Sequence, residues 1–389
     1  MRRIDTAERR LRLAQRHHLH TPSHDVVTVA ANLVGLHSSD PATVYLSAWA
    51  RLDEFHVTDL ASALYEQRTL LRVLGMRRTM FVVTHDVAST ITVACTRDFI
   101  DRERKRLIGW LEEQNIAADG ESWLRTVEAG VLASLDQRGE ATAVEIKADV
   151  PELEAKIVFG EGKTWGGTVG VSTRVLFLLA TSGLIVRARP KGSWISSQYR
   201  WTTTTSWVPG WSSDVDPLEA ERDLVTRWLR TYGPGTETDL VWWTGWGKRR
   251  THKVLADIGA AEVELDERTG YVLPDDVDAP PPTGGWVALL PSLDSTVMGW
   301  KERSWYLGPH ATALYDRNGN AGPTVWVDGR IVGGWGHRAD GEIVYELLED
   351  VGTDAERMIA GKAAELASWL GDVRIKARFP TPLEKSLIG

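Results

Sequence analysis

Residues 70–83 read LLRVLGMRRTMFVV and place two short apolar runs on either side of Gly75. The runs at 70–74 and 78–83 predict a hairpin of two antiparallel strands. Capping signals before it predict helices, and the strongest is Asp40 followed by Pro41, a carboxylate N-cap with proline at the first helical position. These helices cover residues 5–16, 25–33, 40–51 and 58–67. Helices followed by a two-stranded ribbon are the pattern of a winged helix-turn-helix unit.

The same order of elements recurs twice along the chain. In the second copy, helices predicted at 123–137, 142–148 and 172–182 precede strands at 184–189 and 194–201. In the third copy, helices at 217–232, 236–243 and 248–258 precede strands at 263–265 and 271–273. Glycine directly after a helical run, as at Gly139 and Gly183, marks where a helix stops. The repetition predicts three tandem winged-helix units.

A different pattern begins after the Pro- and Gly-rich linker 279–285. Asp328-Gly329, between apolar runs at 325–327 and 330–332, is a strong signal for a two-residue hairpin turn. Further strands are predicted at 286–290 and 343–348, and a helix at 354–370. We therefore predict an α+β fold with winged helix 1 at 1–95, winged helix 2 with a basic wing at 96–210, winged helix 3 at 211–284, and a C-terminal β-rich α+β module at 285–389.

The composition excludes several classes of protein. Of the 389 residues, 43% are apolar and 25% charged, which is typical of globular proteins and excludes disorder over most of the chain. No run of about 18 apolar residues is present, so we expect no membrane partner. The basic start Met1-Arg2-Arg3 has no apolar stretch after it, and the lone Cys95 excludes an intramolecular disulfide framework. We expect a cytoplasmic, nucleoid-associated protein.

The net charge of −8 would argue against binding of nucleic acid if the charges were evenly distributed, but they are not. Residues 162–213 contain no acidic side chain, and several basic residues there fall on the second predicted wing. Local patches decide binding, because charges act over roughly 8–10 Å in physiological salt. Nearby tryptophans are candidates for stacking on bases, although filling a core is the commoner role of tryptophan. The candidate DNA contacts on this wing are Arg187, Arg189, Lys191, Trp194 and Arg200.

The most concentrated polar cluster is GLHSSDP at 35–41, directly before a predicted helix N-terminus. His37 would accept a proton from water near neutral pH, Ser39 would orient that water, and Asp40 would stabilise a developing cation. A plainer interpretation stays open, since an N-cap role explains Asp40 and loop histidines are commonly surface residues. The histidines at 17, 18 and 20 lack carboxylate partners at metal-site spacing, so we predict no metal site.

Five segments resemble the AlkZ-type family of bacterial winged-helix DNA glycosylases. They are VGLHSSDPATVYLSAWA at 34–50, LLRVLGMRRTMFVV at 70–83, LIVRARPKGSWISSQYRW at 184–201, LLPSLDSTVMGWKERSW at 289–305 and GPTVWVDGRIVGGW at 322–335. The resemblance implies tandem winged helices and a β-rich C-terminal part in a C-shaped molecule that grips DNA. It also implies excision of N-alkylated purines, including bulky adducts of natural products, without a metal or other cofactor.

The catalytic signature of that family is Gln-x-Gln or Gln-x-Asp. Aligned on Gly35, its two positions hold His37 and Ser39 in this chain. The resemblance implies that His37 replaces a water-orienting glutamine and that Asp40, one residue further, supplies the carboxylate. It also implies that arginines on the first wing hold phosphates flanking the lesion, namely Arg72, Arg77 and Arg78.

We expect a monomeric, monofunctional DNA glycosylase that hydrolyses the N-glycosidic bond of N7- or N3-alkylated purines in double-stranded DNA, for repair or for self-resistance to a toxin. An alkylated purine carries positive charge and leaves readily, so the enzyme must stabilise the sugar cation and deliver water. No lysine is marked as a Schiff-base nucleophile. Two alternatives stay open: a non-catalytic winged-helix DNA-binding protein or regulator, and a protein-interaction scaffold without salt-dependent affinity for DNA.

Overall fold

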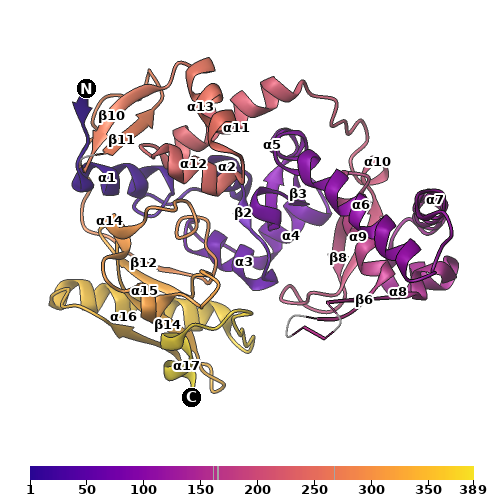
Figure 1. The fold of residues 1–389 in the computed structure, drawn as a ribbon. Helices are drawn as coiled ribbons and strands as arrows, with labels where there is room; N and C mark the ends of the chain where they lie inside the picture. The colour runs from indigo at the N-terminus through magenta and orange to yellow at the C-terminus, as the bar shows by residue number, and fades with distance from the viewer. Residues whose placement is uncertain (161, 164–165, 267) are drawn as a thin grey trace.

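The computed structural model describes residues 1–389 except 161, 164, 165 and 267, and it has the predicted mixed α+β class. The strands form several small sheets and not one large sheet. Figure 1 shows the C-terminal module in orange and yellow at one end and the second unit in purple and pink at the other, with the first unit between them and the third unit along the top.

The first unit contains the three-stranded sheet β2-β4-β3. Asp5 and Asp25 cap their helices through side-chain oxygens, as predicted. The hairpin at Gly75 is present, but a short 3-10 turn separates its strands, so the second strand begins at Met80 and not at residue 78. The bounds are α1 Thr6–Arg16, α2 Val26–Asn32, β2 Leu36–His37, α3 Pro41–Trp49, α4 Val57–Tyr65, β3 Leu70–Leu74, η1 Met76–Arg78, β4 Met80–Thr84, α5 His85–Ile91 and the π-helical turn η2 Thr92–Thr96.

The second unit begins with a long helix, α6, that was not predicted from the sequence, and it contains the sheet β5-β9-β8. The predicted strand at 194–201 is wrong at its start, because Trp194 packs on the rings of Tyr45 and Trp369 and the strand begins only at Tyr199. The bounds are α6 Arg97–Glu113, α7 Gly120–Arg138, β5 Ala141–Thr142, α8 Ala143–Asp149, η3 Pro151–Glu154, β6 Lys156–Phe159, β7 Gly167–Gly170, α9 Val171–Thr181, β8 Ile185–Pro190, β9 Tyr199–Thr203 and α10 Thr204–Trp207.

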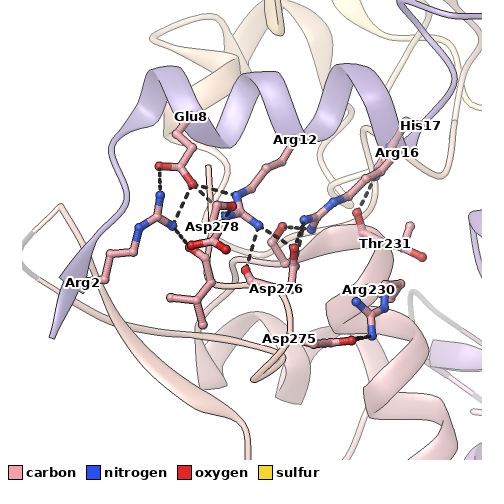
Figure 2. Close-up of polar contacts among 12 residues, drawn as sticks. Arg2, Glu8, Arg12, Arg16, His17, Arg230, Thr231, Asp275, Asp276 and Asp278 are labelled. Carbon is pink, nitrogen blue, oxygen red and sulfur yellow. Dashed lines mark hydrogen bonds and ion pairs between the residues drawn. The ribbon is translucent and has the colours of Figure 1, made fainter. Parts of the chain in front are cut away.

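The third unit shares its sheet with the start of the chain, a contact that crosses the predicted boundaries at 95 and 211. Strand β1 pairs in parallel with β10. Helix α1 is tied to the same unit, since Arg12 and Arg16 both bind the carboxylate of Asp276 (Figure 2). The bounds are β1 Arg2–Arg3, α11 Pro217–Tyr232, α12 Glu237–Thr244, α13 Lys248–Asp257, β10 Ala261–Leu265 and β11 Arg268–Val272.

The C-terminal module is a four-stranded antiparallel sheet of order β12-β13-β14-β15. The predicted turn at Asp328-Gly329 joins its two middle strands, and α16 packs against β12 while α17 packs against β14. The bounds are β12 Val287–Leu290, α14 Ser304–Leu307, α15 Ala311–Leu314, β13 Thr324–Val327, β14 Arg330–His337, β15 Ile343–Leu347, α16 Thr353–Leu370 and α17 Pro382–Ile388.

The buried apolar residues show which units fold together. One continuous cluster runs through the first unit, the third unit and part of the C-terminal module, whereas most of the second unit packs around its own cluster between residues 107 and 185. A further cluster joins Ala42 and Leu46 of α3 to the C-terminal sheet and α16. The start of α3 therefore lies where the central core meets the C-terminal module.

The three-stranded sheets stand where the wings were predicted, but the tandem winged-helix organisation and the exact unit boundaries remain predictions. Among the described residues, no helix combines the length and apolar character needed to cross a membrane.

Candidate active site and nucleic-acid interface

The loop at 35–41 is held in one conformation by its neighbours in the first unit. Gly35 has a φ of 109°, and a Cβ at this position would meet Val83 Cγ1 at 2.6 Å, so only glycine fits. Strand β2 then pairs His37 with Phe81, and the Ser38 N–H donates to the Met80 carbonyl at 2.7 Å. The chain is thus fixed on β4 up to the point where α3 begins.

The C-terminal module holds the other side of the same loop. The Ser295 hydroxyl donates to the Gly35 carbonyl at 2.9 Å and accepts from the His37 N–H at 3.0 Å. One helical turn further, the Thr43 hydroxyl donates to the Ser292 carbonyl at 2.8 Å. The segment that follows β12 therefore positions the loop although it lies some 250 residues away in sequence.

A buried ion pair joins the same two segments of the chain. Arg51 and Asp294 are both fully buried and their charged atoms are 2.6 Å apart, with the Ser47 hydroxyl donating to the same carboxylate at 2.6 Å. Burial alone would raise the pKa of Asp294, but the facing guanidinium and the hydrogen bonds hold that pKa below its ordinary value. The pair fixes α3 to the segment that carries Ser295.

Asp40 is the predicted N-cap of α3. One carboxylate oxygen accepts from the Ala42 N–H and the other from the Arg378 N–H, both at 3.0 Å. Burial raises the pKa of Asp40 above its ordinary value, although these two hydrogen bonds and the Arg378 charge oppose the shift. The Arg378 guanidinium also donates to the Ser39 carbonyl at 3.1 Å. The N-cap interpretation of Asp40 is therefore confirmed, and two N–H groups hold the carboxylate in a fixed orientation. Its catalytic role stays a prediction, since the residue is only 7% exposed.

The side chains of Ser39 and His37 differ in their exposure to solvent. Ser39 is half-buried, and its hydroxyl accepts from the Met80 N–H at 3.2 Å. The His37 side chain is 2% exposed and meets the edge of Phe81. Burial, together with the nearby Arg77 charge, lowers the pKa of His37 to about 3. A buried neutral imidazole is a poor base at neutral pH, so this geometry favours an orienting role over removal of a proton from water.

Two of the predicted DNA-contacting arginines meet beside this loop. Arg72 is 3% exposed and donates to the Ser38 hydroxyl at 2.6 Å and to the Tyr199 hydroxyl at 2.7 Å. Arg187, half-buried on β8, lies over the rings of Tyr199 and Trp201. In the part of the chain that the structure describes, neither guanidinium pairs with a carboxylate. Burial lowers the pKa of Arg187 to about 10, and the Arg72 charge adds to this effect.

Arg77 and Arg78 point away from Arg72. Arg77 adopts a left-handed conformation and its guanidinium lies 3.7 Å from the centre of the Trp242 ring, while Arg78 forms an ion pair with Glu103 of α6. The first-wing arginines therefore do not form a single row, and the burial of Arg72 argues against direct contact of that side chain with a phosphate.

The remaining candidates on the second wing are spread out. Arg189 pairs with Glu66 at 3.1 Å across an exposed surface, Lys191 is exposed, and Arg200 is half-buried on β9. Trp194 is held between Tyr45 and Trp369, which makes it a packing residue between the second wing and the C-terminal module in this structure.

Several residues around the loop were not predicted, and the clearest are Ser295, Tyr199 and Arg378. Polar residues between the apolar runs of LLPSLDS and the alternating basic residues of IKARF were the available signals, but neither shows which loop it contacts. Among the described residues, no group of histidine, cysteine, aspartate and glutamate side chains is arranged to hold a metal ion.

The comparisons with known proteins show the family and the fold of the chain. The AlkZ-like DNA glycosylase family model matches residues 30–369, so the chain belongs to that family of DNA glycosylases. The chain is similar in structure to the Streptomyces sahachiroi DNA glycosylase AlkZ, with a TM-score of 0.74 and 22% identity over 97% of this chain and 99% of the other. A search of curated protein sequences found no significant match.

Proposed function

We propose that this DNA glycosylase hydrolyses the N-glycosidic bond of N7- or N3-alkylated purines in double-stranded DNA, bulky guanine adducts included. The observation that carries the proposal is a fixed carboxylate, Asp40, directly after the half-exposed Ser39. The nearby guanidiniums of Arg72 and Arg187 have no carboxylate partner among the described residues. A carboxylate suits a cationic sugar, and unpaired guanidiniums suit the phosphates that flank it.

The chemistry requires little acid catalysis. The C1′–N bond breaks with its electron pair passing to the purine, which neutralises the positive charge of the alkylated base. The sugar becomes oxocarbenium-like, and Asp40 stabilises that charge while water forms the new bond to C1′. Ser39 orients the water, and the buried His37 fixes the loop that carries both residues. No lysine stands in this loop, which supports a monofunctional enzyme.

The DNA contacts divide into two roles. Arg187, Lys191 and Arg378 are at least partly exposed and are proposed to bind phosphates, which contributes affinity without sequence preference. Arg72 is buried and acts as a positioning residue, because it links the loop at Ser38 to the second wing at Tyr199. The tandem winged helices, the monomeric state and the cytoplasmic location remain part of this proposal.

A single-turnover base-release assay tests the function. Duplex DNA that carries N7-methylguanine, or separately a bulky guanine adduct, is incubated with excess protein and then treated with alkali, which cuts abasic sites. We expect strand cuts that require both protein and alkali, because a monofunctional enzyme leaves the sugar intact. Cuts without alkali would contradict the monofunctional mechanism. Salt-sensitive binding without base release would favour the non-catalytic DNA-binding protein instead.

A further inference from the structure

A small cavity of about 30 Å³ lies behind the candidate catalytic loop. Asp40 forms one wall, His337 at the end of β14 forms another, and Glu384 from the first turn of α17 closes it. Three elements far apart in sequence thus bring two carboxyl groups and an imidazole to one place. A cavity of this size holds one or two water molecules when polar groups line it.

Two of these groups have atoms without a partner in the part of the chain that the structure describes. Glu384 is 5% exposed and its Oε2 makes no hydrogen bond there, while His337 is 8% exposed and its Nε2 makes none. The other ring nitrogen, Nδ1, accepts from the Ile375 N–H at 3.3 Å, so the neutral ring carries its proton on the unpartnered Nε2. Glu384 and His337 both line the cavity, and buried polar groups that lack a protein partner normally bind water.

Charged and titratable side chains from several elements lie around Glu384. Asp40, His337 and Lys376 line the same cavity, and Lys385 follows Glu384 on α17. Arg338, directly after β14, donates to the Leu387 carbonyl of α17. Burial raises the pKa of Glu384 to about 7, and the Asp40 charge adds to this rise, although backbone N–H groups oppose it. Glu384 is therefore able to gain or lose a proton near neutral pH.

We propose that water in this cavity connects Asp40 to Glu384 and His337, and that Glu384 receives the proton released when water attacks the sugar. The proposal rests on the glycosylase function above. Glu384 acts through Asp40 and does not touch the substrate, so it is a positioning residue of the reaction and not a catalytic one.

The balance of the reaction requires such an acceptor. A cationic purine nucleotide and one water give an abasic sugar, a neutral purine and one proton. The water oxygen forms the bond to C1′, and the electron pair of the C1′–N bond goes to the purine. The released proton passes first to the Asp40 carboxylate and then, through the cavity water, to the ionised Glu384. Asp40 is thereby returned to its charged form.

The test is the pH dependence of single-turnover base release by the wild type, Glu384→Gln and a control, Glu346→Gln, whose side chain is exposed on β15. For the wild type we expect a rate that rises about tenfold between pH 6 and pH 8. Glu384→Gln should be about tenfold slower at pH 8 and lose this dependence, while Glu346→Gln should match the wild type. Titration of the substrate is common to all three proteins and cancels in the comparison.

Thermal unfolding provides a readout that needs no activity. A carboxyl whose pKa is raised by folding stabilises the protein at low pH, and this contribution is lost as pH rises toward 7. The Tm of the wild type minus that of Glu384→Gln should therefore fall by up to about 4 °C between pH 5 and pH 7.5. A constant difference, or a variant that keeps the wild-type rate profile, would overturn the relay alone. A wild type that releases no base would overturn the proposed function and the relay with it.

Discussion

The protein uses arginine in two contrasting ways. Around α1, the guanidiniums in Figure 2 are joined to carboxylates or carbonyls, as when Arg12 and Arg16 share Asp276 at 2.9 and 2.6 Å. Beside the loop at 35–41, the guanidiniums of Arg72 and Arg187 face only hydroxyl groups and aromatic rings in the described part of the chain. Both regions are partly buried, so burial does not explain the difference.

The contrast separates structural charge from charge that is available for a ligand. A buried guanidinium with a carboxylate partner is satisfied within the protein, and removal of either partner leaves an uncompensated charge. A guanidinium without such a partner retains its attraction for an anion such as a phosphate. The α1 region therefore joins the first and third units, whereas in the loop region the partly exposed Arg187 is the proposed phosphate contact and the buried Arg72 positions the loop.

The largest effect is expected at the fully buried pair of Arg51 and Asp294. Asp294→Ala should lower the free energy of unfolding by about 3–5 kcal/mol, because the guanidinium stays buried without its partner. Chemical denaturation measures this loss, and Asp354→Ala provides a control, since that exposed pair with Arg357 should contribute less than about 1 kcal/mol. Equal losses in the two variants would contradict the structural role of the buried pair.

Matched substitutions in the two regions test whether the arginines around α1 stabilise the fold and Arg187 binds DNA. Arg12→Met should cost about 2 kcal/mol of stability and leave the DNA affinity of the folded protein unchanged, because it removes a paired charge. Arg187→Met should reduce DNA affinity about tenfold and lower the slope of log affinity against log salt by about 1. Fluorescence anisotropy over a salt series measures the affinities. A reversed pattern would disprove the division into structural and binding arginines.

A smaller effect concerns His37, which is buried and forms no ion pair with any residue that the structure describes. Its pKa of about 3 lies below the ordinary value, so its contribution is fully present above about pH 6.5 and is lost as pH falls. Relative to His37→Gln, the wild type should lose about 1 kcal/mol of stability between pH 7 and pH 5.5. His56→Gln, at an exposed site, is the control. An unchanged difference would show that His37 is accessible to water.

Local signals predicted much of the fold. The Asp40-Pro41 cap and the Asp328-Gly329 turn act within a few residues, and the structure has the helix and the hairpin that they predict at or near the predicted bounds. The parallel pairing of β1 with β10 was not predictable, because it joins residues separated by most of the chain. Strand β9 starts late because Trp194 is drawn onto Tyr45 and Trp369, a contact that β propensity does not reveal.

The site was predictable only in part for the same reason. The loop at 35–41 could be recognised from its polar residues before a helix, but its partners come from distant segments. Ser295 fixes the loop and Glu384 lies behind Asp40, and neither has a local pattern that marks it. Arg72 has the residue type of a phosphate contact, yet the second wing covers it.

In the proposed mechanism the Asp40 carboxylate is required for base release, whereas the carboxylates of the α1 region stabilise the fold. The most direct test compares Asp40→Asn with Asp276→Asn in the single-turnover assay, with stability measured alongside. Asparagine still caps a helix, so Asp40→Asn should fold and keep its DNA affinity but release base at least about 100-fold more slowly. Asp276→Asn should lose stability and retain the wild-type rate in its folded fraction. Normal base release by a folded Asp40→Asn would contradict the account.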